Sequence, residues 1–281
     1  MTWRSNVAIV LAGLVLIVLA LVVQTGTAAP QLTRASYIPY VELPATPTVT
    51  PIPTPSPTPD PACQTISGQT YTTIPVNSPP ITTPVPAQHP DLDLSIRSWQ
   101  STNETLGLVN YSGGADASAP QLASSFATSR TPTFSSAHRV YDWDWPNFKR
   151  GSLLSNYPVT LLGMATVSGE TIHLPSRGAG TDIYQGKYHA LVLFASKTRI
   201  TLRYGRDDNF QSYSMHFDNV CIEPRLLTLY EQSNAAGRST LPALAAGQPF
   251  CTERNGEVLF AIRDWGTFLD PRSRKDWWQG R

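Results

Sequence analysis

The chain has 281 residues, of which 15% are charged, and its formal net charge is +1. No block of lysines or arginines stands out, so the sequence lacks the basic patch expected of a nucleic-acid-binding protein. Its 25 prolines and its many serines and threonines indicate an exported, loop-rich β-protein rather than a cytosolic helical one.

The first segment contains an unbroken apolar run, Val7–Val23, preceded by Arg4. Its 17 residues reach the lower limit for spanning a bilayer and exceed a typical signal-peptide core. We therefore expect residues 1–29 to be a transmembrane signal anchor, or a signal peptide cleaved near Ala28-Ala29. The positive-inside rule puts the rest of the chain outside the cytoplasm, anchored to the membrane or secreted.

Residues 30–62 are expected to form a disordered stalk. The stretch Pro44–Pro61, PATPTVTPIPTPSPTPDP, has proline at nearly every second or third position, which prevents helix and sheet formation and favours extended polyproline II. At about 3.1 Å per residue, the stalk would hold its cargo roughly 50–60 Å from the anchor. A plain flexible linker is a compatible interpretation.

Residues 63–281 are expected to form a single extracytoplasmic, mostly β domain, with a loop-rich wrapping part over 63–150 and a core sheet over 151–281. In the first part, short β-prone stretches predict strands at Tyr71–Val76, Asp91–Trp99 and Gly107–Tyr111. Asp91–Trp99 is the clearest of them, because Leu92, Leu94 and Ile96 alternate with polar residues.

The segment Val140–Phe148, VYDWDWPNF, is a candidate ligand-binding surface. In an extended conformation Tyr141, Trp143 and Trp145 share one face, while Asp142 and Asp144 share the other. Flat aromatic rings can stack on sugar CH groups while carboxylates accept hydrogen bonds from hydroxyls. The same rings are also typical of a buried core, and the sequence leaves both interpretations open.

The second part of the domain is organised around an antiparallel meander. We expect the domain to form an antiparallel sheet or a barrel-like structure. Three strands are predicted there, Tyr188–Ala195, Arg199–Tyr204 and Tyr213–Val220, because apolar residues alternate within them and turn-forming residues separate them. In the second strand Ile200, Leu202 and Tyr204 share one face. Further strands are predicted at Pro158–Thr166, Glu170–Leu174 and Glu257–Trp265.

One short helix is expected at about residues 224–236. Pro224 suits its first position, and Gly237 can end it. The following stretch, Leu241–Phe250, is predicted to be a turn-containing connector. A pair of tryptophans at Trp277-Trp278 is expected to close the flank of the domain.

The three cysteines suit one disulfide and one remaining thiol, because disulfides persist outside the cytoplasm. We favour Cys63 with Cys221, which would tie the start of the domain to the exit of the meander. Cys221 with Cys251 is the alternative pairing.

The histidines do not predict a metal site. No pair among the five has the His-x-His or His-x-x-x-His spacing that zinc hydrolases use. His216 and Asp218 share one strand face and could be half of a site, but strand histidines are more often hydrogen-bonded structural residues. No metal or other cofactor is therefore expected.

Other catalytic patterns are also missing from the sequence. Asp207-Asp208-Asn209 offers too few oxygen ligands for a calcium loop and suits a polar turn. Ser112 and Ser168 lack the G-x-S-x-G elbow of serine hydrolases. Asp142 and Glu170 could be nominated as paired carboxylates, but nothing in the sequence brings them together. We therefore expect no catalytic residues.

Five sequence segments resemble segments of other proteins: VYDWDWPNF, ITLRYGRDDN, CIEPRLLTLY, LPALAAGQPF and FAIRDWGTFLDPRSRKDWW. In these, residues 63–281 resemble a family of membrane-anchored, exported bacterial β-domain proteins that have a Pro/Thr stalk and no known activity. In fold alone, the order of the meander, the Gly247-Gln248 turn and the last strand is similar to the barrel of lysostaphin-type peptidoglycan endopeptidases.

The second resemblance implies a cell-wall role without the zinc chemistry. That family binds zinc through a His-x-x-x-Asp motif and a His-x-His motif. The candidate positions here read His173-Leu174-Pro175-Ser176-Arg177 and Glu257-Val258-Leu259, so the ligands are missing. If the resemblance holds, this chain is an inactive relative.

The sequence as a whole predicts a non-catalytic domain of the cell envelope, tethered to the membrane, that binds a cell-wall glycan or an envelope protein. Two alternatives come from other classes. One is a hydrolase of peptidoglycan or polysaccharide, and the other is a purely structural component of the envelope.

Overall fold

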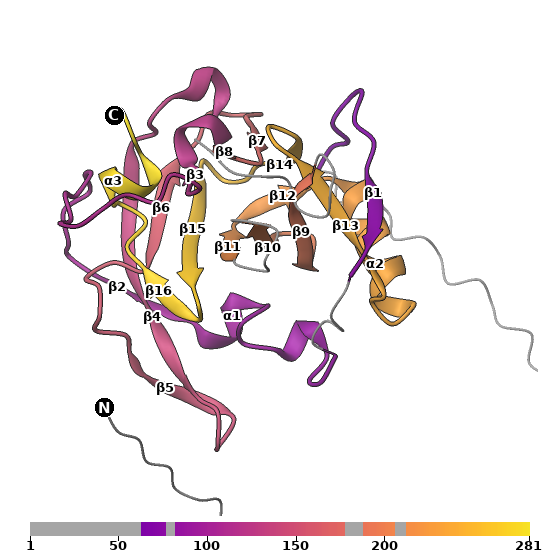
Figure 1. The fold of residues 1–281 in the computed structure, drawn as a ribbon, viewed down its shortest axis with the longest axis horizontal. Coiled ribbons are helices and arrows are strands. Elements are labelled where there is room, and N and C mark those ends of the chain that lie inside the picture. The colour runs from indigo at the N-terminus through magenta and orange to yellow at the C-terminus, as the bar shows by residue number, and fades with distance from the viewer. Residues whose placement is uncertain (1–62, 77–81, 178–187, 206–211) are drawn as a thin grey trace, which may run out of the picture. The chain divides into compact units, whose positions relative to one another are not determined.

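The computed structural model describes residues 63–76, 82–177, 188–205 and 212–281, all of which belong to the second of two compact units, Met1–Thr54 and Pro55–Arg281. The described residues are mostly β, with antiparallel sheets and three α-helices (Figure 1). The predicted fold class is confirmed to this extent. The predicted anchor and stalk and the Asp207-Asp208-Asn209 turn lie outside the described residues. No helix in the described ranges is long and apolar enough to cross a membrane.

The strands are β1 (Thr72–Pro75), β2 (Trp99–Ser101), β3 (Pro120–Gln121), β4 (Phe134–Asp144), β5 (Lys149–Leu153), β6 (Leu161–Ala165), β7 (Thr171–His173), β8 (Ser176–Arg177), β9 (Tyr188–Ala195), β10 (Arg199–Gly205), β11 (Ser212–Asp218), β12 (Val220–Ile222), β13 (Thr240–Ala245), β14 (Pro249–Glu253), β15 (Glu257–Asp264) and β16 (Thr267–Leu269). The helices are α1 (Leu94–Arg97), α2 (Pro224–Ala235) and α3 (Arg274–Trp277), with 3-10 turns at Pro86–Gln88, Leu122–Ser125 and Ala127–Ser129.

The main sheet has 11 strands, and its path runs β1-β13-β9-β10-β11-β15-β6-β4-β2, with β16 paired to β15 and β5 paired to β4. A smaller sheet has the order β12-β14-β7, and β3 pairs with β8. The main sheet therefore takes β1, β2 and β4 from residues 63–150 as well as strands from the rest of the domain.

The predicted meander is confirmed as β9, β10 and β11 at the centre of this sheet (Figure 1). The side chains of these strands and of the neighbouring β15 alternate between the two faces of the sheet. The apolar face carries Ile200, Leu202, Met215, Phe217 and Phe260, all 1% exposed or less, and belongs to the largest hydrophobic cluster.

The opposite face, which we call the polar face, carries Arg199, Thr201, His216, Asp218 and Arg263. These residues share one side because Arg199 pairs with Asp218, Thr201 with His216, and His216 with Ala261, two residues before Arg263. The polar face is covered rather than solvated: Thr201, His216 and Asp218 are at most 4% exposed.

Residues 89–98, the covering segment, lie over the polar face. Thr201 Oγ1 donates a hydrogen bond to the Leu92 carbonyl at 2.5 Å, and Arg199 Nε lies 3.1 Å from Asp93 Oδ1. The predicted strand Asp91–Trp99 is wrong, since helix α1 occupies this segment and β2 begins only at Trp99. Asp93 is the physical reason, because its carboxylate accepts hydrogen bonds from the Ser95 N–H and hydroxyl and caps the helix.

Two other local predictions need correction. The connector predicted at Leu241–Phe250 is instead strand β13, a turn at Ala246-Gly247-Gln248, and the start of β14. Around Gly107–Tyr111 the only pairing among the described residues is an isolated bridge between Val109 and Ser273. The helix predicted at 224–236 is confirmed as α2, with Pro224 in its first turn.

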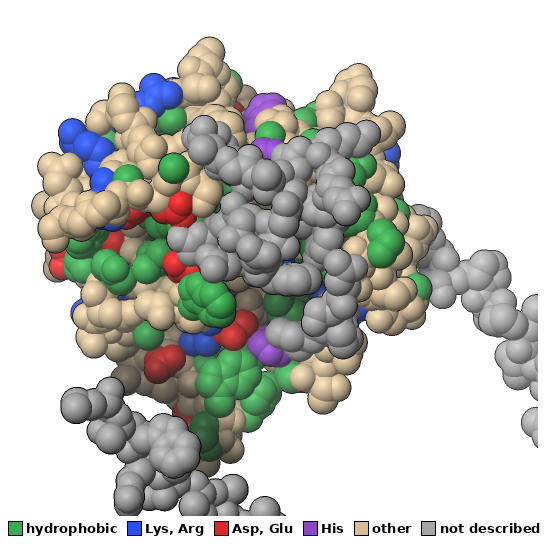
Figure 2. Space-filling view, viewed as in Figure 1, with side chains coloured by type: hydrophobic (Ala, Val, Ile, Leu, Met, Phe, Trp, Pro, Cys, Tyr) green, Lys and Arg blue, Asp and Glu red, His purple; other side chains and the backbone are tan. Residues whose placement is uncertain are grey.

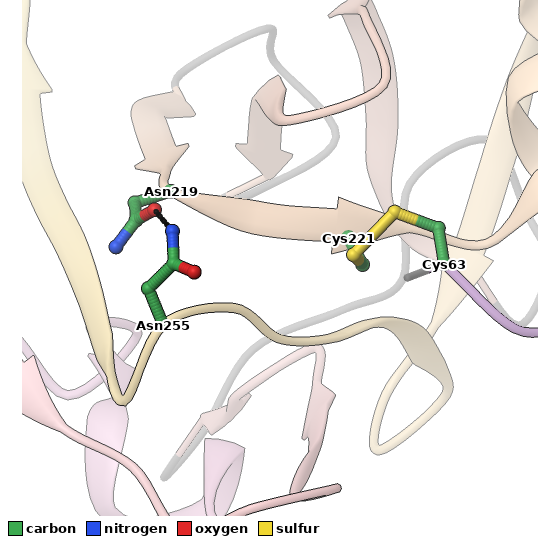
Figure 3. The surroundings of a disulfide bond; sticks show 4 residues. All are labelled: Cys63, Asn219, Cys221 and Asn255. Carbon is green, nitrogen blue, oxygen red and sulfur yellow. Dashed lines mark hydrogen bonds between the residues drawn. A yellow bond between two sulfur atoms is a disulfide. The ribbon is translucent and has the colours of Figure 1, made fainter. Parts of the chain in front are cut away.

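The Cys63–Cys221 disulfide is confirmed and joins the first described residue to β12, with Cα atoms 5.0 Å apart (Figure 3). The alternative pairing is wrong. Cys251 lies opposite Ile222 in the β12–β14 ladder, whereas Cys221 lies opposite Thr252. Because successive side chains alternate, Cys251 points to the other face of that sheet, where it is buried as a free thiol.

Asparagines shape a bend and a turn of the chain near this bond. Asn219 separates β11 from β12 with a positive φ of 59°, a conformation that asparagine tolerates better than most residues. Its amide donates to the Glu257 carbonyl at 2.8 Å and accepts from Asn255 Nδ2 at 3.3 Å (Figure 3). Asn255 and Gly256, both with positive φ, form the turn that leads into β15.

Candidate functional site

The predicted ligand-binding segment forms the end of a hairpin, in which β4 turns back into β5 through residues 145–148 (Figure 1). The pairing of these strands shifts register between Tyr141 and Trp143, which interrupts the strict alternation of faces. The strand itself ends at Asp144, so that Trp145 belongs to the turn.

The three predicted aromatic residues consequently do not share one exposed face. Trp143 is buried at 9% exposure, Tyr141 is half-buried, and Trp145 is 45% exposed. The Tyr141 ring packs under the Arg150 guanidinium at 5.2 Å. Both readings of the sequence therefore apply, to different residues: Trp143 belongs to the interior, and Trp145 to the surface.

A cluster of rings, which we call the aromatic tip, forms around the turn from Trp143, Trp145, Phe148 and His89. The Phe148 ring lies 5.4 Å from that of Trp143 and 6.5 Å from that of Trp145, and the Trp145 ring lies 5.4 Å from that of His89. Phe148 is 48% exposed, and it was not singled out from the sequence. Figure 2 shows a large hydrophobic patch on this side of the domain next to acidic, basic and histidine side chains.

The two predicted carboxylates have different roles. Asp144 accepts hydrogen bonds from the Asn147 backbone at 3.3 Å and its side chain at 2.8 Å, and so holds the turn. The Asp142 side chain is 60% exposed, and its Oδ1 lies 3.5 Å from Arg97 Nη1 of the covering segment. The same Oδ1 accepts a hydrogen bond from the Trp143 backbone N–H at 2.8 Å, so the exposed carboxylate is tied to the first residue of the aromatic tip.

Arginines and an aspartate form a buried charged cluster beneath Asp142. Asp91 Oδ1 lies 2.6 Å from Arg97 Nη2 and 2.8 Å from Arg263 Nη1, and both guanidinium groups lie over the Phe268 ring. Burial alone would raise the pKa of Asp91, but the two arginines outweigh it and hold this pKa below its usual range. Arg97 and Arg263 therefore already place beside the Asp91 and Asp142 carboxylates the positive charge that a metal ion would bring.

His216 is a neutral residue of the interior. The Thr201 hydroxyl gives its proton to Leu92, so it accepts the hydrogen bond from His216 Nδ1 at 2.9 Å. The other ring nitrogen, Nε2, has no hydrogen-bond partner among the described residues. Burial, followed by the field of Arg263, lowers the pKa of His216 to about 3.

The structure does bring His216 and Asp218 to one strand face, as predicted. Burial raises the pKa of Asp218 to about 7, against the opposing effect of Arg199. Within the described ranges, no three or more histidine, cysteine, aspartate and glutamate side chains are arranged to hold a metal ion. Glu170, the other nominated carboxylate, pairs with Arg130 at 2.5 Å, whereas Asp142 faces Arg97.

One polar arrangement was missed by sequence reasoning. The side chains of Ser101, His138, Ser136 and Glu257, which we call the Ser–His row, are joined by hydrogen bonds across the main sheet. The residues come from β2, β4 and β15, so no local motif contains them. Only the strand register, which places Ser101 opposite His138, could have revealed the arrangement.

No family model matches the sequence, no curated protein is detectably similar to it, and no solved structure matches it.

Proposed function

We propose that this chain is an extracytoplasmic domain of the cell envelope that binds glycan through its aromatic tip. The observation that carries the proposal is the pair of exposed rings, Trp145 and Phe148, at the end of a hairpin beside the exposed Asp142 carboxylate. Rings provide flat apolar faces for sugar CH groups, and a carboxylate accepts hydrogen bonds from sugar hydroxyls.

The packing beneath the aromatic tip, which fixes its exposed rings, supports a role in binding. Trp143 and His89 pack beneath the exposed rings, and Asp144 fixes the turn that carries them. Rings whose orientation is fixed in advance lose little conformational entropy when a ligand stacks on them.

The apolar run Val7–Val23 and the Pro/Thr stalk support a location on the outer side of the membrane. In that arrangement, the stalk would carry the domain into the envelope, where cell-wall glycan is the abundant partner. A surface protein is the other partner that such a patch could serve, and it is an outcome of the test below.

The proposal is tested by retention of the chain on peptidoglycan and on insoluble polysaccharides. We expect the unaltered chain to be retained and a Trp145→Ala/Phe148→Ala double variant to lose at least about 10-fold in affinity, since each stacked ring contributes on the order of 1 kcal/mol. Trp265→Ala is the matched control, because Trp265 is 80% exposed in the separate β15–β16 turn.

Two results would count against the proposal. Retention on none of these polymers would eliminate glycan binding and leave a protein partner or a structural role. Equal losses in the double variant and in Trp265→Ala would eliminate the aromatic tip as the site.

A second candidate, a hydrolase of an envelope polymer, is favoured by one observation. Ser101 Oγ lies 3.2 Å from His138 Nδ1, within the reach that a nucleophile needs from its base.

A further inference from the structure

The Ser–His row forms an ordered chain of side chains on one surface of the main sheet. Ser101 Oγ lies 3.2 Å from His138 Nδ1, His138 Nε2 lies 2.9 Å from Ser136 Oγ, and Ser136 Oγ lies 2.7 Å from Glu257 Oε1. Each link is of hydrogen-bond length. The chain leads from an exposed serine at the sheet's last strand, β2, to a carboxylate on β15.

The hydrogen bonds decide which ring nitrogen of His138 carries the proton. A carboxylate can only accept, so Ser136 must donate its hydroxyl proton to Glu257. Ser136 Oγ then accepts from His138, which places a proton on Nε2. In the neutral ring Nδ1 is therefore the acceptor, and it faces the Ser101 hydroxyl. This is the arrangement of a serine with its general base.

A glycine on β6 leaves the space through which the Glu257 side chain reaches the Ser–His row. Gly163 on β6 lies between β15 and β4, and a Cβ at this position would collide with both Ser136 Oγ and Glu257 Oε1. Ser135 donates a second hydrogen bond to the same Glu257 oxygen at 2.6 Å. The carboxylate is thereby held in place to stabilise positive charge on His138 through Ser136.

The protonation of His138 also suits this role. Burial lowers the pKa of His138, and the negative charge of Glu257 opposes the shift only in part. The ring is therefore neutral at pH 7 and free to accept a proton at Nδ1.

We propose that Ser101 is a nucleophile that attacks oxygen esters, with His138 as its general base. Ser101 Oγ forms a bond to the acyl carbon while its proton passes to His138 Nδ1. The carbon–oxygen bond of the ester then breaks, and the leaving alcohol takes that proton. Water, activated in turn by His138, hydrolyses the acyl-serine and releases the carboxylic acid.

The position of Ser101 indicates the class of substrate. The residue is exposed on a sheet surface, so it suits a small acyl group displayed on a larger molecule, such as an O-acetyl group on a polymer. The proposal uses none of the residues of the aromatic tip, and it stands or falls independently of glycan binding.

The test uses the full chain with two probes, a fluorophosphonate, which modifies activated serines, and p-nitrophenyl acetate. We expect the fluorophosphonate to label Ser101, as located by mass spectrometry of the digested protein, and p-nitrophenyl acetate to be hydrolysed. Ser101→Ala should abolish both, and His138→Gln should slow both by about 100-fold, the usual contribution of a positioned base.

Ser168→Ala is the matched control, because Ser168 is also an exposed serine but lies in the turn between β6 and β7, outside the Ser–His row. Its rates should stay within about two-fold of the parent. Glu257 is a positioning residue: since its charge raises the pKa of His138, Glu257→Gln should move the midpoint of the pH–labelling profile to lower pH. Circular dichroism of each variant confirms that it is folded.

Labelling at another serine, or none, would overturn the proposal. It would equally be overturned if His138→Gln were labelled as fast as the parent chain. A midpoint unchanged in Glu257→Gln would remove Glu257 from the proposed machinery.

Discussion

Residues on the two faces of the main sheet are buried through different interactions, apolar packing on one face and specific hydrogen bonds on the other. On the apolar face, Leu202, Met215 and Phe260 pack into a large cluster, and their burial depends on area alone. On the polar face, Thr201 and His216 are as deeply buried, but each depends on a particular partner atom: Thr201 bonds to the Leu92 carbonyl of the covering segment, and His216 bonds to Thr201. The first face should therefore respond to lost volume, and the second to lost partners and to pH.

The largest effect is expected on the apolar face. Phe260 is fully buried, and its ring lies 4.9 Å from that of Phe217. Phe260→Ala should lower the free energy of unfolding by about 3–5 kcal/mol, through lost burial and the cavity that remains. Urea unfolding at two pH values measures it, and the loss should be the same at both. A strongly pH-dependent loss would contradict the division between the faces.

Removing the shared carboxylate of the charged cluster is expected to rank second. Asp91→Ala leaves Arg97 and Arg263 facing each other without their common partner. We expect a loss of about 2–3 kcal/mol, since breaking a buried ion pair leaves uncompensated charge in the interior. Thermal and urea unfolding would show it. A loss below about 0.5 kcal/mol would mean that solvent already screens the cluster.

The meander itself was predictable, because Ile200, Leu202 and Tyr204 alternate with polar residues in the sequence. The same alternation indicates that Arg199, Thr201 and Arg203 face solvent. Thr201 does not, because its cover lies 109 residues upstream at Leu92. Periodicity reports which side chains share a face, but it carries no information on what a distant segment does to that face.

The candidate sites were predictable to different degrees for the same reason. Trp145 lies in a local sequence pattern, so its segment could be singled out, although the end of β4 at Asp144, which leaves Trp145 in the turn, could not be predicted. The Ser–His row joins Ser136 to Glu257 across 121 positions, and only strand pairing brings them together. The disulfide was predictable because the predicted export signal and the place of Cys63 after the proline-rich stretch limited the choices.

A smaller, pH-dependent effect is expected at Asp218 on the polar face. Burial raises its folded-state pKa from the usual 3.8 to about 7, so the folded state favours the protonated form. This contribution to stability is present at pH 4 and is lost as the pH rises through 7. Asp218→Asn should therefore stabilise the protein by on the order of 1–2 kcal/mol at pH 8 and by little at pH 4.

Unfolding curves of parent and variant between pH 4 and pH 8 test this expectation. The titration of His216 is common to both proteins and cancels in their difference. A gain that grows toward low pH would reverse the sign and show that Arg199 governs Asp218.

The smallest effect is expected at the aromatic tip, which belongs to neither face. Because Trp145 is 45% exposed, Trp145→Ala should change the free energy of unfolding by no more than about 0.5–1 kcal/mol. The same variant, measured on polysaccharide, separates a binding role from a structural one. A large loss of stability would instead assign Trp145 to the core.

The Cys63–Cys221 bond has a mechanical consequence. Among the described residues, β1 is an end strand of the main sheet and pairs only with β13, so a pull entering through it could peel the sheet open one hydrogen bond at a time. With the bond in place, tension arriving from the chain before Cys63 passes through sulfur directly to β12. The chain between the two cysteines, which are 158 positions apart in the sequence, carries none of that load until the bond is reduced.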